Sequence, residues 1–431
     1  MKYVVENSGV PASFMKRELP RAQEYLAHLR EVHEKGGYTE TECTLNLAHD
    51  NHMIGQIEAL YREKFTHELK YVVLIGIGGS NLGTKAVYDA LYGTTDTFHP
   101  NRHPKLICIE TCDPELLHSF DSFLKEGVKP EEILFFVVSK SGATTEIAFN
   151  AEVISSLCKK HGIGYNRWVA ITDEHSPLHT LAQNAGITVI NIPKKVGGRF
   201  SVLSPVGRAP LRFVIGPLGE WLAGASEMIE RCLGDDPEHN PALQSALILA
   251  WHIKNKTAVH DTFVFHPELE SVGRWYRQLL GESLGKDGEG IIPTVSVGST
   301  DLHSIGQTYL GGPKIFYTTF LFAESGKQKG ALQHESSLWS SLVPGIAHKK
   351  PEQIMQAILK GTMAAYEKIE TPFTQAILPD VSARSVGAFF GWKMAEIMIA
   401  GHLLGVNAFD QPAVELYKEV TRDILQGGRE V

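Results

Sequence analysis

The chain of 431 residues lacks the basic excess that several classes of binding protein require. Lys and Arg number 41 against 49 Asp and Glu, which gives a formal net charge of -8. A main partner that is a nucleic acid or an anionic membrane surface usually calls for a net positive protein. We therefore expect no nucleic-acid and no membrane partner, and an anionic ligand would have to be met by a local group of donors.

Cysteine is also scarce, with five residues scattered along the chain. Only Cys108 and Cys112 are close together, and no matching Cys or His pair follows to complete a metal site. Cys108 falls inside a predicted buried strand, so we expect free thiols in a reducing cytosol and no metal. His49 and His52 stand near each other in the sequence, and we interpret both as surface or capping residues.

Long apolar runs are missing as well. The most apolar predicted helix, around 394–406, is interrupted by Glu396 and His402. Glu6 comes before any apolar run could form at the N-terminus, which argues against a secretory signal peptide. A hydrophobic content of 43% and a charged content of 21% are typical of soluble globular proteins. We expect a cytoplasmic protein, and its length predicts two or more domains.

The chain does contain a regular alternation of apolar strands and helices, which begins at residue 71. The predicted strands cover 71–77, 106–110, 134–139, 168–172 and 187–192, and the helices between them cover 82–91, 114–124, 145–160 and 177–184. This pattern is typical of an α/β domain with a parallel, doubly wound sheet. Ligands bind such sheets at the carboxyl ends of the strands, beside helix N-termini.

A second, less regular α/β domain is predicted further along the chain. Its predicted strands are 261–265, 292–297, 314–322 and 374–378, and helices are predicted at 218–233, 242–255, 271–284, 302–309, 351–370 and 382–404. The chain is accordingly divided into a helical lead-in (1–65), a first α/β domain (66–200), a second (201–408) and a C-terminal turn and helix (409–431).

Two loops that follow predicted strands suit a phosphate group. In GIGGSNLGT (76–84), backbone N–H groups and the Ser80 hydroxyl could hold a small phosphate. The third glycine of a dinucleotide fingerprint would fall on Asn81, which disfavours the alternative of a nicotinamide-dependent dehydrogenase. In SKSGATTE (139–146), hydroxyls and a lysine precede a helix, namely Ser139, Lys140, Ser141, Thr144 and Thr145. These hydroxyls and the lysine are more groups than helix capping requires, and they favour a binding site for a sugar phosphate.

The segment VGGRFSVLSPVG (196–207) is predicted to be a loop between the two domains. Its single guanidinium, Arg199, stands among glycines and the small residues Ser201 and Ser204, and could clamp an anion between two halves of the protein. The alternative for this loop alone is an ordinary interdomain turn with a solvated arginine.

Three residues of the second half could take part in acid–base chemistry. Glu282 lies among leucines next to glycines in QLLGESLGKDGEG (278–290), where desolvation would make it a stronger base, although most Glu residues are simply exposed. His303 is predicted to open a helix that Ser299 or Asp301 could cap. Lys418 is the last residue of GHLLGVNAFDQPAVELYK (401–418) and, taken alone, is interpreted as a solvated lysine.

Six segments in order resemble the glucose-6-phosphate isomerase (phosphoglucose isomerase) family in its compact bacterial form. They are GIGGSNLG, SKSGATTE, VGGRFSVLSPVG, GESLGK, DLHSIGQ and LLGVNAFDQPAVELYK, and the resemblance covers residues 70–420. It implies two sugar-isomerase (SIS) domains, a homodimer with shared active sites, and no metal or other cofactor. It also implies interconversion of glucose 6-phosphate and fructose 6-phosphate in glycolysis and gluconeogenesis, by ring opening and a cis-enediolate.

The resemblance also implies a role for each matching residue. Glu282 is the base that moves a proton between C1 and C2, and Arg199 stabilises the enediolate. His303, reaching in from the partner subunit, and Lys418 assist ring opening. The phosphate is held by Ser80, Ser139, Ser141 and Thr144, and the remaining substrate contacts are Gly79, Gln278 and Gln411.

Four positions depart from the family pattern, at Ala143, Gly391, Ala408 and Ala413, and Lys194 and Lys195 precede the Arg199 segment where smaller or acidic residues are usual. None of them removes a proposed catalytic group. Two alternatives stay open beside the main interpretation. One is a sugar-phosphate-binding SIS protein without catalysis, and the other is an isomerase that also accepts mannose 6-phosphate.

Overall fold

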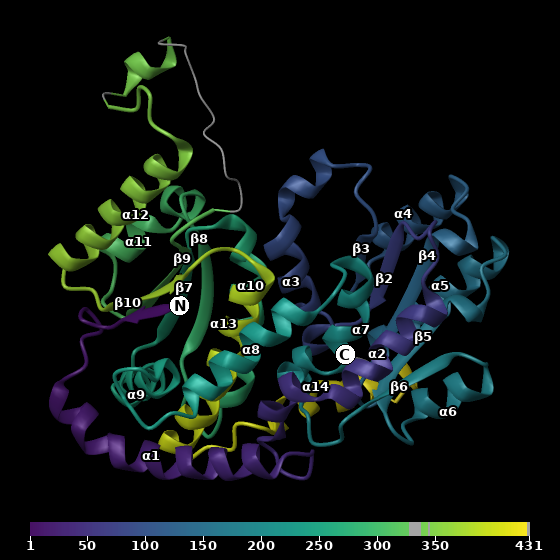
Figure 1. The fold of residues 1–431 in the computed structure, drawn as a ribbon, viewed down its shortest axis with the longest axis horizontal. Helices are drawn as coiled ribbons and strands as arrows, with labels where there is room; N and C mark the ends of the chain where they lie inside the picture. The colour runs from purple at the N-terminus through teal and green to yellow at the C-terminus, as the bar shows by residue number, and fades with distance from the viewer. Residues whose placement is uncertain (327–337, 344, 429–431) are drawn as a thin grey trace.

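The protein consists of two five-stranded sheets that lie side by side. The structure, a computed structural model, describes residues 1–326, 338–343 and 345–428. Figure 1 shows α3 (Leu82–Tyr92) and α10 (Glu270–Leu284) between the sheets, where the two helices pack against each other. Each of the two helices follows a strand of its own sheet, so their contact joins the two halves of the chain.

The first sheet confirms the five strands predicted from the apolar runs. In sheet order they are β3 (Lys105–Ile109), β2 (Tyr71–Ile75), β4 (Ile133–Val138), β5 (Trp168–Asp173) and β6 (Thr188–Ile192), all parallel. The crossover helices after β3, β4 and β5 are α4 (Pro114–Lys125), α5 (Thr145–Lys160) and α6 (Pro177–Asn184). Ile75 of β2 is in register with Val137 of β4, so the loops after these strands leave the sheet side by side.

The second sheet is parallel except at one edge. Its strands, in order, are β1 (Lys2–Val4), β10 (Phe373–Leu378), β9 (Phe316–Ala323), β7 (Val259–Val264) and β8 (Ile292–Val297). The edge strand β1 runs antiparallel to β10. The sequence did not predict β1, because three residues are too few to show an alternation and its partner lies at the other end of the chain.

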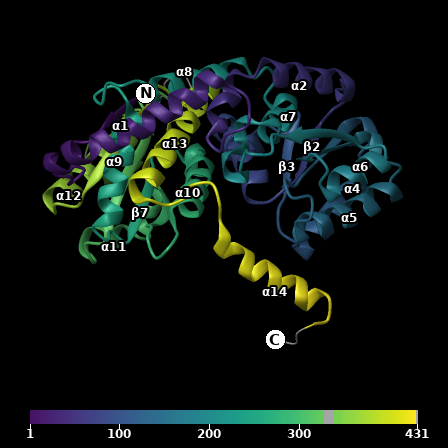
Figure 2. The ribbon, with the colours of Figure 1, turned by 90° about the horizontal axis from the view of Figure 1, so that it is seen from below.

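The other helices pack around the sheets and against one another, except for α14 (Glu415–Leu425), which projects from the body of the molecule (Figure 2). They are α1 (Ala12–Lys35), α2 (Asn51–Lys64), α7 (Pro205–Val214), α8 (Gly219–Cys232), α9 (Pro241–Lys254), α11 (Gly306–Gly311), α12 (Pro351–Lys368), α13 (Ala383–Leu404) and α14 (Glu415–Leu425). The apolar helix α13 is buried against α8 and α9. Its Glu396 is buried too and accepts a hydrogen bond from Lys393 Nζ at 2.6 Å, so the charge is paired inside the core.

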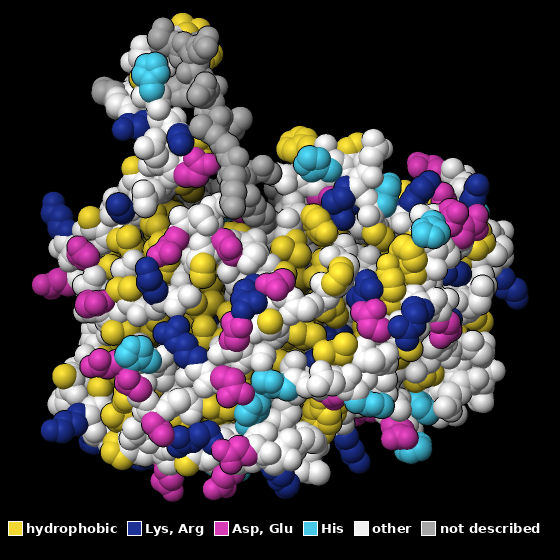
Figure 3. All heavy atoms as spheres, in the orientation of Figure 1, with side chains coloured by type: hydrophobic (Ala, Val, Ile, Leu, Met, Phe, Trp, Pro, Cys, Tyr) yellow, Lys and Arg dark blue, Asp and Glu magenta, His cyan; other side chains and the backbone are white. Residues whose placement is uncertain are grey.

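Among the described residues, none of the helices combines the length and the apolar character needed to cross a bilayer. The five cysteines are all free thiols. On the face drawn in Figure 3, acidic and basic side chains are interspersed over both halves of the molecule.

Two local predictions were wrong. Residues 196–207 are not a loop, because the 3₁₀ helix η6 (Gly198–Leu203) runs directly into α7, whose first turn is capped by Ser204 with Pro205 following it. The helix predicted at 302–309 is two pieces, the 3₁₀ helix η8 (Thr300–His303) and α11. Asp301 does not cap a helix there, since its carboxylate accepts hydrogen bonds from Val297 N and Ser304 Oγ.

Candidate active site

Arg199 is buried where the two halves of the chain meet, on η6. Its side chain is 2% exposed, Nε donates to Ser283 Oγ at 2.7 Å, and Nη1 lies 3.4 Å from Glu282 Oε2. Burial lowers the pKa of Arg199 from its usual value, while the Glu282 and Asp410 carboxylates oppose that shift. Because guanidinium pKa values are very high, the side chain remains a fixed cation beside a carboxylate.

The same guanidinium holds the segment that follows α13. Arg199 Nη2 donates to the carbonyl oxygens of Ala408 at 2.6 Å and Asp410 at 2.8 Å, and Nη1 donates to Gln411 Oε1 at 2.7 Å. Lys286 Nζ adds an ion pair with Asp410 Oδ1 at 2.7 Å. Arg199 therefore fixes residues 408–411 relative to η6 and to the end of α10.

Glu282 lies in the last turn of α10 with both carboxylate oxygens hydrogen-bonded. Oε1 accepts from Gln278 Nε2 at 3.0 Å and Oε2 from Arg199 Nη1, yet the side chain keeps 34% of its surface exposed. Gln278 also faces the first sheet, because a Cβ on Gly78 would come within 2.9 Å of Gln278 Nε2. The carboxylate is thus held in one orientation and remains accessible to a small molecule, as a general base must be.

The glycine-rich segment after β2 touches η6 directly. It contains the 3₁₀ helix η2 (Gly78–Ser80), and Ser201 Oγ of η6 donates to the carbonyl oxygens of Gly79 at 3.3 Å and Gly198 at 2.6 Å. A Cβ on Gly79 would lie 2.2 Å from the carbonyl carbon of Gly198. Glycine is needed at 79 because backbone meets backbone there.

We expect Gly79→Ala to push η6 away from η2 and so to displace Arg199. The added methyl has no free space, and overpacking of this kind costs about 1–3 kcal/mol. We predict a lower melting temperature and about a tenfold loss of kcat, since small displacements of positioned groups cost rate. Gly198→Ala is the matched control, because a Cβ at that position meets nothing within 4 Å. Identical kinetics and melting for the two variants would contradict the role of this contact.

The predicted phosphate loop lies at the end of β4 and the start of α5. Ser139 Oγ and Thr144 Oγ1 are 2.8 Å apart, and Thr144 is the N-cap of α5 but makes no side-chain bond to the helix backbone. Lys140 Nζ donates to Lys194 O at 2.8 Å, and burial lowers its pKa. Ser141 is exposed, and its Oγ accepts from Ala143 N. The first N–H groups of α5 thus have no cap from Thr144 and suit an anion.

The structure does not bring His303 and Lys418 to this cluster through any described contact. His303 is exposed at the end of η8. Lys418 pairs with Glu415 Oε1 at 2.7 Å on α14, a helix that Figure 2 shows projecting from the body of the molecule. The contacts described above join five of the predicted site residues, namely Gly79, Arg199, Gln278, Glu282 and Gln411. Ser80, Ser139, Lys140, Ser141 and Thr144 lie on the two neighbouring loops.

Three residues that the sequence analysis did not select also belong to the cluster. Ser283 accepts from Arg199 Nε, and the Lys286–Asp410 ion pair supports the segment that Arg199 holds. Ser283 and Lys286 belong to the quoted GESLGK segment and Asp410 to LLGVNAFDQPAVELYK, so proximity to Glu282 and Gln411 was the available signal.

The departures from the family pattern have local explanations at two positions. A Cβ on Gly391 would come within 2.8 Å of the Ala225 carbonyl oxygen, so α13 packs closely on α8 and leaves no room for a glutamate. Ala408 contributes its backbone oxygen to Arg199, which any residue could do. Ala143 and Ala413 are exposed, and nothing in the structure explains them.

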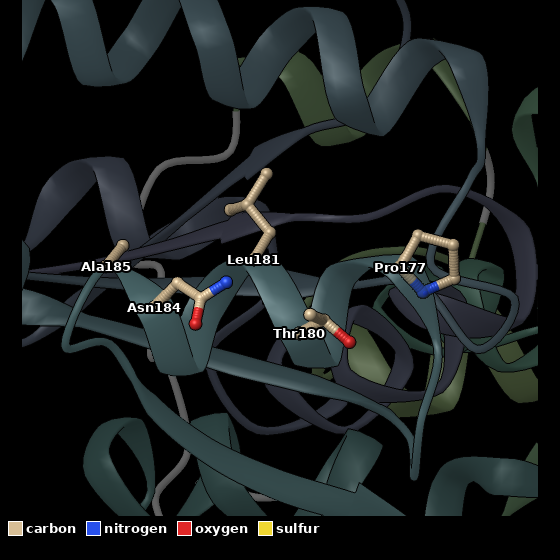
Figure 4. A pocket seen from close by; sticks show the side chains of 5 residues that line it. All are labelled: Pro177, Thr180, Leu181, Asn184 and Ala185. Carbon is tan, nitrogen blue, oxygen red and sulfur yellow. The ribbon is translucent and has the colours of Figure 1, made fainter.

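A surface hollow on the first domain is not part of this cluster. It is lined by Pro177, Thr180, Leu181, Asn184 and Ala185, all on α6 or at its end, and Figure 4 shows these side chains spread along one helix face. The lining contains no titratable group, so the hollow offers no acid or base. The cluster around Arg199 remains the better candidate.

Comparison with known proteins gives consistent matches over most of the chain. The family model for phosphoglucose isomerase matches residues 30–430. A glucose-6-phosphate isomerase from Carboxydothermus hydrogenoformans is 34% identical, and the matched region covers 94% of this chain and 88% of that protein. A probable glucose-6-phosphate isomerase from Methanococcus maripaludis is 31% identical over 85% of this chain and 81% of the relative.

Solved structures resemble the fold. A hypothetical protein from Thermus thermophilus superposes with a TM-score of 0.84 at 28% identity, covering 98% of this chain and 99% of that one. A glucose-6-phosphate isomerase from Chlamydia trachomatis superposes with a TM-score of 0.75 at 23% identity, over 90% of this chain and 75% of that one. Both similarities extend over the two sheets.

Proposed function

The chain belongs to the phosphoglucose isomerase family and catalyses the reversible isomerisation of D-glucose 6-phosphate and D-fructose 6-phosphate, and we propose that the cluster of Arg199 and Glu282 performs this reaction. The SIS fold expected from the sequence agrees with the superpositions. One observation carries the assignment of the site. A partly exposed carboxylate that could remove a proton lies 3.4 Å from a buried cation that could stabilise the resulting anion.

Proton transfer is assigned to Glu282. In the open-chain aldose, its carboxylate takes the proton from C2, the C–H electron pair forms the C1=C2 double bond, and the carbonyl oxygen on C1 becomes negative. Glu282 then returns the proton to C1, while the proton of the hydroxyl on C2 moves to the oxygen on C1 and leaves the ketose carbonyl. Gln278 Nε2 holds Oε1, so a carboxylate in one fixed orientation is assigned to both proton transfers.

Arg199 stabilises the enediolate that forms between the two proton transfers. Its guanidinium is fixed by Ser283, Ala408 and Asp410 and therefore needs no reorganisation as charge develops. We assign the phosphate to the start of α5 and to Ser80, Ser139, Ser141 and Thr144, where uncapped N–H groups and hydroxyls are available. Gly79 and Gln411 contact the substrate in this arrangement, and Lys140 supplies a nearby positive charge.

We assign ring opening to His303 and Lys418 and propose that the protein is a homodimer in which His303 comes from the partner. The exposed apolar residues of α14 support a second subunit, because Leu416, Tyr417 and Leu425 are 72%, 58% and 67% exposed in the single chain. A projecting helix with exposed apolar residues is typical of a surface that another subunit covers. Closed twofold dimers are the commonest way to provide that cover.

Mixing of inactive subunits tests the shared site. We expect His303→Ala and Glu282→Gln each to be inactive alone and to regain activity when mixed, because each mixed dimer then contains one complete site. Random subunit exchange would restore about a quarter of the wild-type activity. If His303 serves its own chain, no mixed dimer has a complete site and the mixture remains inactive. A monomer in sedimentation velocity would contradict the dimer.

The reaction itself is tested by proton exchange. We expect the wild type, incubated with fructose 6-phosphate in deuterium oxide with a chelator present, to form glucose 6-phosphate that carries deuterium at C2. Nuclear magnetic resonance reads both the conversion and the label. Binding of the sugar phosphate without conversion would instead favour the non-catalytic alternative. Free thiols and the sugar-phosphate substrates support our proposal of a cytoplasmic location.

A further inference from the structure

Three potential metal ligands meet on the surface, and none of them is among the residues assigned to isomerisation. His33 belongs to the last turn of α1, His49 ends the 3₁₀ helix η1 (Cys43–His49), and Glu230 lies on α8. His33 Nε2 is 3.1 Å and His49 Nε2 is 3.7 Å from Glu230 Oε1. His49 is exposed, as the sequence predicted, but its partners His33 and Glu230 come from distant parts of the chain and could not be inferred from the residues around it.

The spacing of these atoms matches a coordination sphere. One ligand atom from each of the three residues lies within 4.8 Å of the others. Zinc bonds to nitrogen and oxygen are about 2.0–2.2 Å long, which places tetrahedral ligand atoms about 3.3 Å apart. The observed distances bracket this value, and small side-chain rotations would close the site.

A hydrogen bond fixes His33 in the tautomer that a metal needs. Asn46 Nδ2 donates to the backbone oxygen of Gly37 at 2.9 Å, so Asn46 Oδ1 faces His33 Nδ1, 3.0 Å away. His33 Nδ1 therefore carries a proton and donates it to Asn46, and the lone pair of a neutral His33 is on Nε2. Metal-binding histidines are usually oriented in this way by a second residue.

The lone pair on His33 Nε2 then points at the Glu230 carboxylate. Two acceptors this close need a proton or a cation between them. His49 adds a third ligand, and Ser226 Oγ, one helical turn before Glu230, lies 3.2 Å from His49 Nδ1 and 3.3 Å from His49 Nε2.

We propose that His33, His49 and Glu230 form a binding site for a divalent transition-metal ion, with zinc as the natural choice. Two imidazoles and one carboxylate suit zinc, whereas calcium and magnesium prefer oxygen ligands throughout. Glu230 is 59% and His49 36% exposed at the side chain, so an ion can enter from solvent and keep a water ligand. A bound ion would fasten the N-terminal segment to α8, which η1 contacts directly.

Titration of untagged, chelator-treated protein with cobalt(II) tests the site, because four-coordinate cobalt absorbs strongly in the visible range. We expect one tight equivalent per chain and the same stoichiometry with zinc in calorimetry. Glu230→Gln and His49→Gln should each weaken binding at least about tenfold, since even residues that only orient ligands contribute 10- to 100-fold. Zinc should raise the melting temperature of the wild type but not of these variants.

His52→Gln and Glu34→Gln are the matched controls, because both residues are exposed and are close in sequence to His49 and His33. We expect the controls to bind cobalt and zinc like the wild type. Equal stoichiometry and affinity in the wild type and Glu230→Gln would overturn the proposal. So would binding that all four variants weaken to the same extent, since that is the behaviour of dispersed surface histidines. Circular dichroism verifies that each variant is folded.

Discussion

Glu282→Gln is expected to lower kcat about a thousandfold in both directions while KM changes only a few-fold. Positioned general bases contribute about 10²–10⁴ in rate, and an amide of nearly the same shape cannot accept the C2 proton. The measurements are steady-state kinetics and deuterium incorporation at C2. Because both steps use the same carboxylate, isomerisation and exchange should fall together.

A second substitution of Glu282 and a control at another position of α10 separate chemistry from geometry. The carboxylate accepts from both Gln278 and Arg199, so an amide leaves one of these donors unpaired. Glu282→Asp keeps the charge but shortens the side chain, and we expect a smaller loss than with Gln. Glu270→Gln is the control and should be active, because Glu270 is a half-exposed carboxylate on the same helix that pairs with Arg274. Loss of substrate binding in Glu282→Gln, with kcat unchanged, would remove the base from the mechanism.

Arg199→Ala is expected to lower kcat by about 10²–10³ with a smaller effect on substrate affinity. Removal of one fixed positive group beside a developing oxyanion has a cost of about this size. The structure adds a second consequence, because the guanidinium also holds the carbonyl oxygens of Ala408 and Asp410. We therefore expect a lower melting temperature as well. Arg199→Lys retains the positive charge but lacks the planar guanidinium with its five N–H donors. Relative to Arg199→Ala, it should recover part of kcat but little of the melting temperature.

Lys286→Ala distinguishes the two roles of Arg199. Lys286 is the other anchor of the same segment, through its ion pair with Asp410, but it has no contact with Glu282 among the described hydrogen bonds. If Arg199 acts on the oxyanion, Lys286→Ala should reduce kcat far less than Arg199→Ala does. Equal losses in the two variants would mean that Arg199 acts only by holding residues 408–411.

The pattern of residues was sufficient to predict the elements that carry the substrate loops. All five strands of the first sheet lie where the apolar runs placed them, because strands covered on both faces are continuously apolar. The helices after β3, β4 and β5 also begin at the predicted residues, which are proline or threonine. Residues 196–207 were harder to predict. Two glycines and a proline are typical of a turn, whereas the cap of Ser204 and contacts with Gly79 stabilise a helix there.

The sequence by itself determined the fold class, the family and the identity of the candidate groups, since these depend on local periodicity and on residue types in order. Tertiary structure alone decided how they meet. It showed that Arg199 binds residues 408–411 as well as facing Glu282, that Gly79 must lack a side chain, and that β1 completes the distant sheet. It also brought His33, His49 and Glu230 together. Such contacts join residues far apart in the chain, and their geometry depends on how helices pack, which no local pattern encodes.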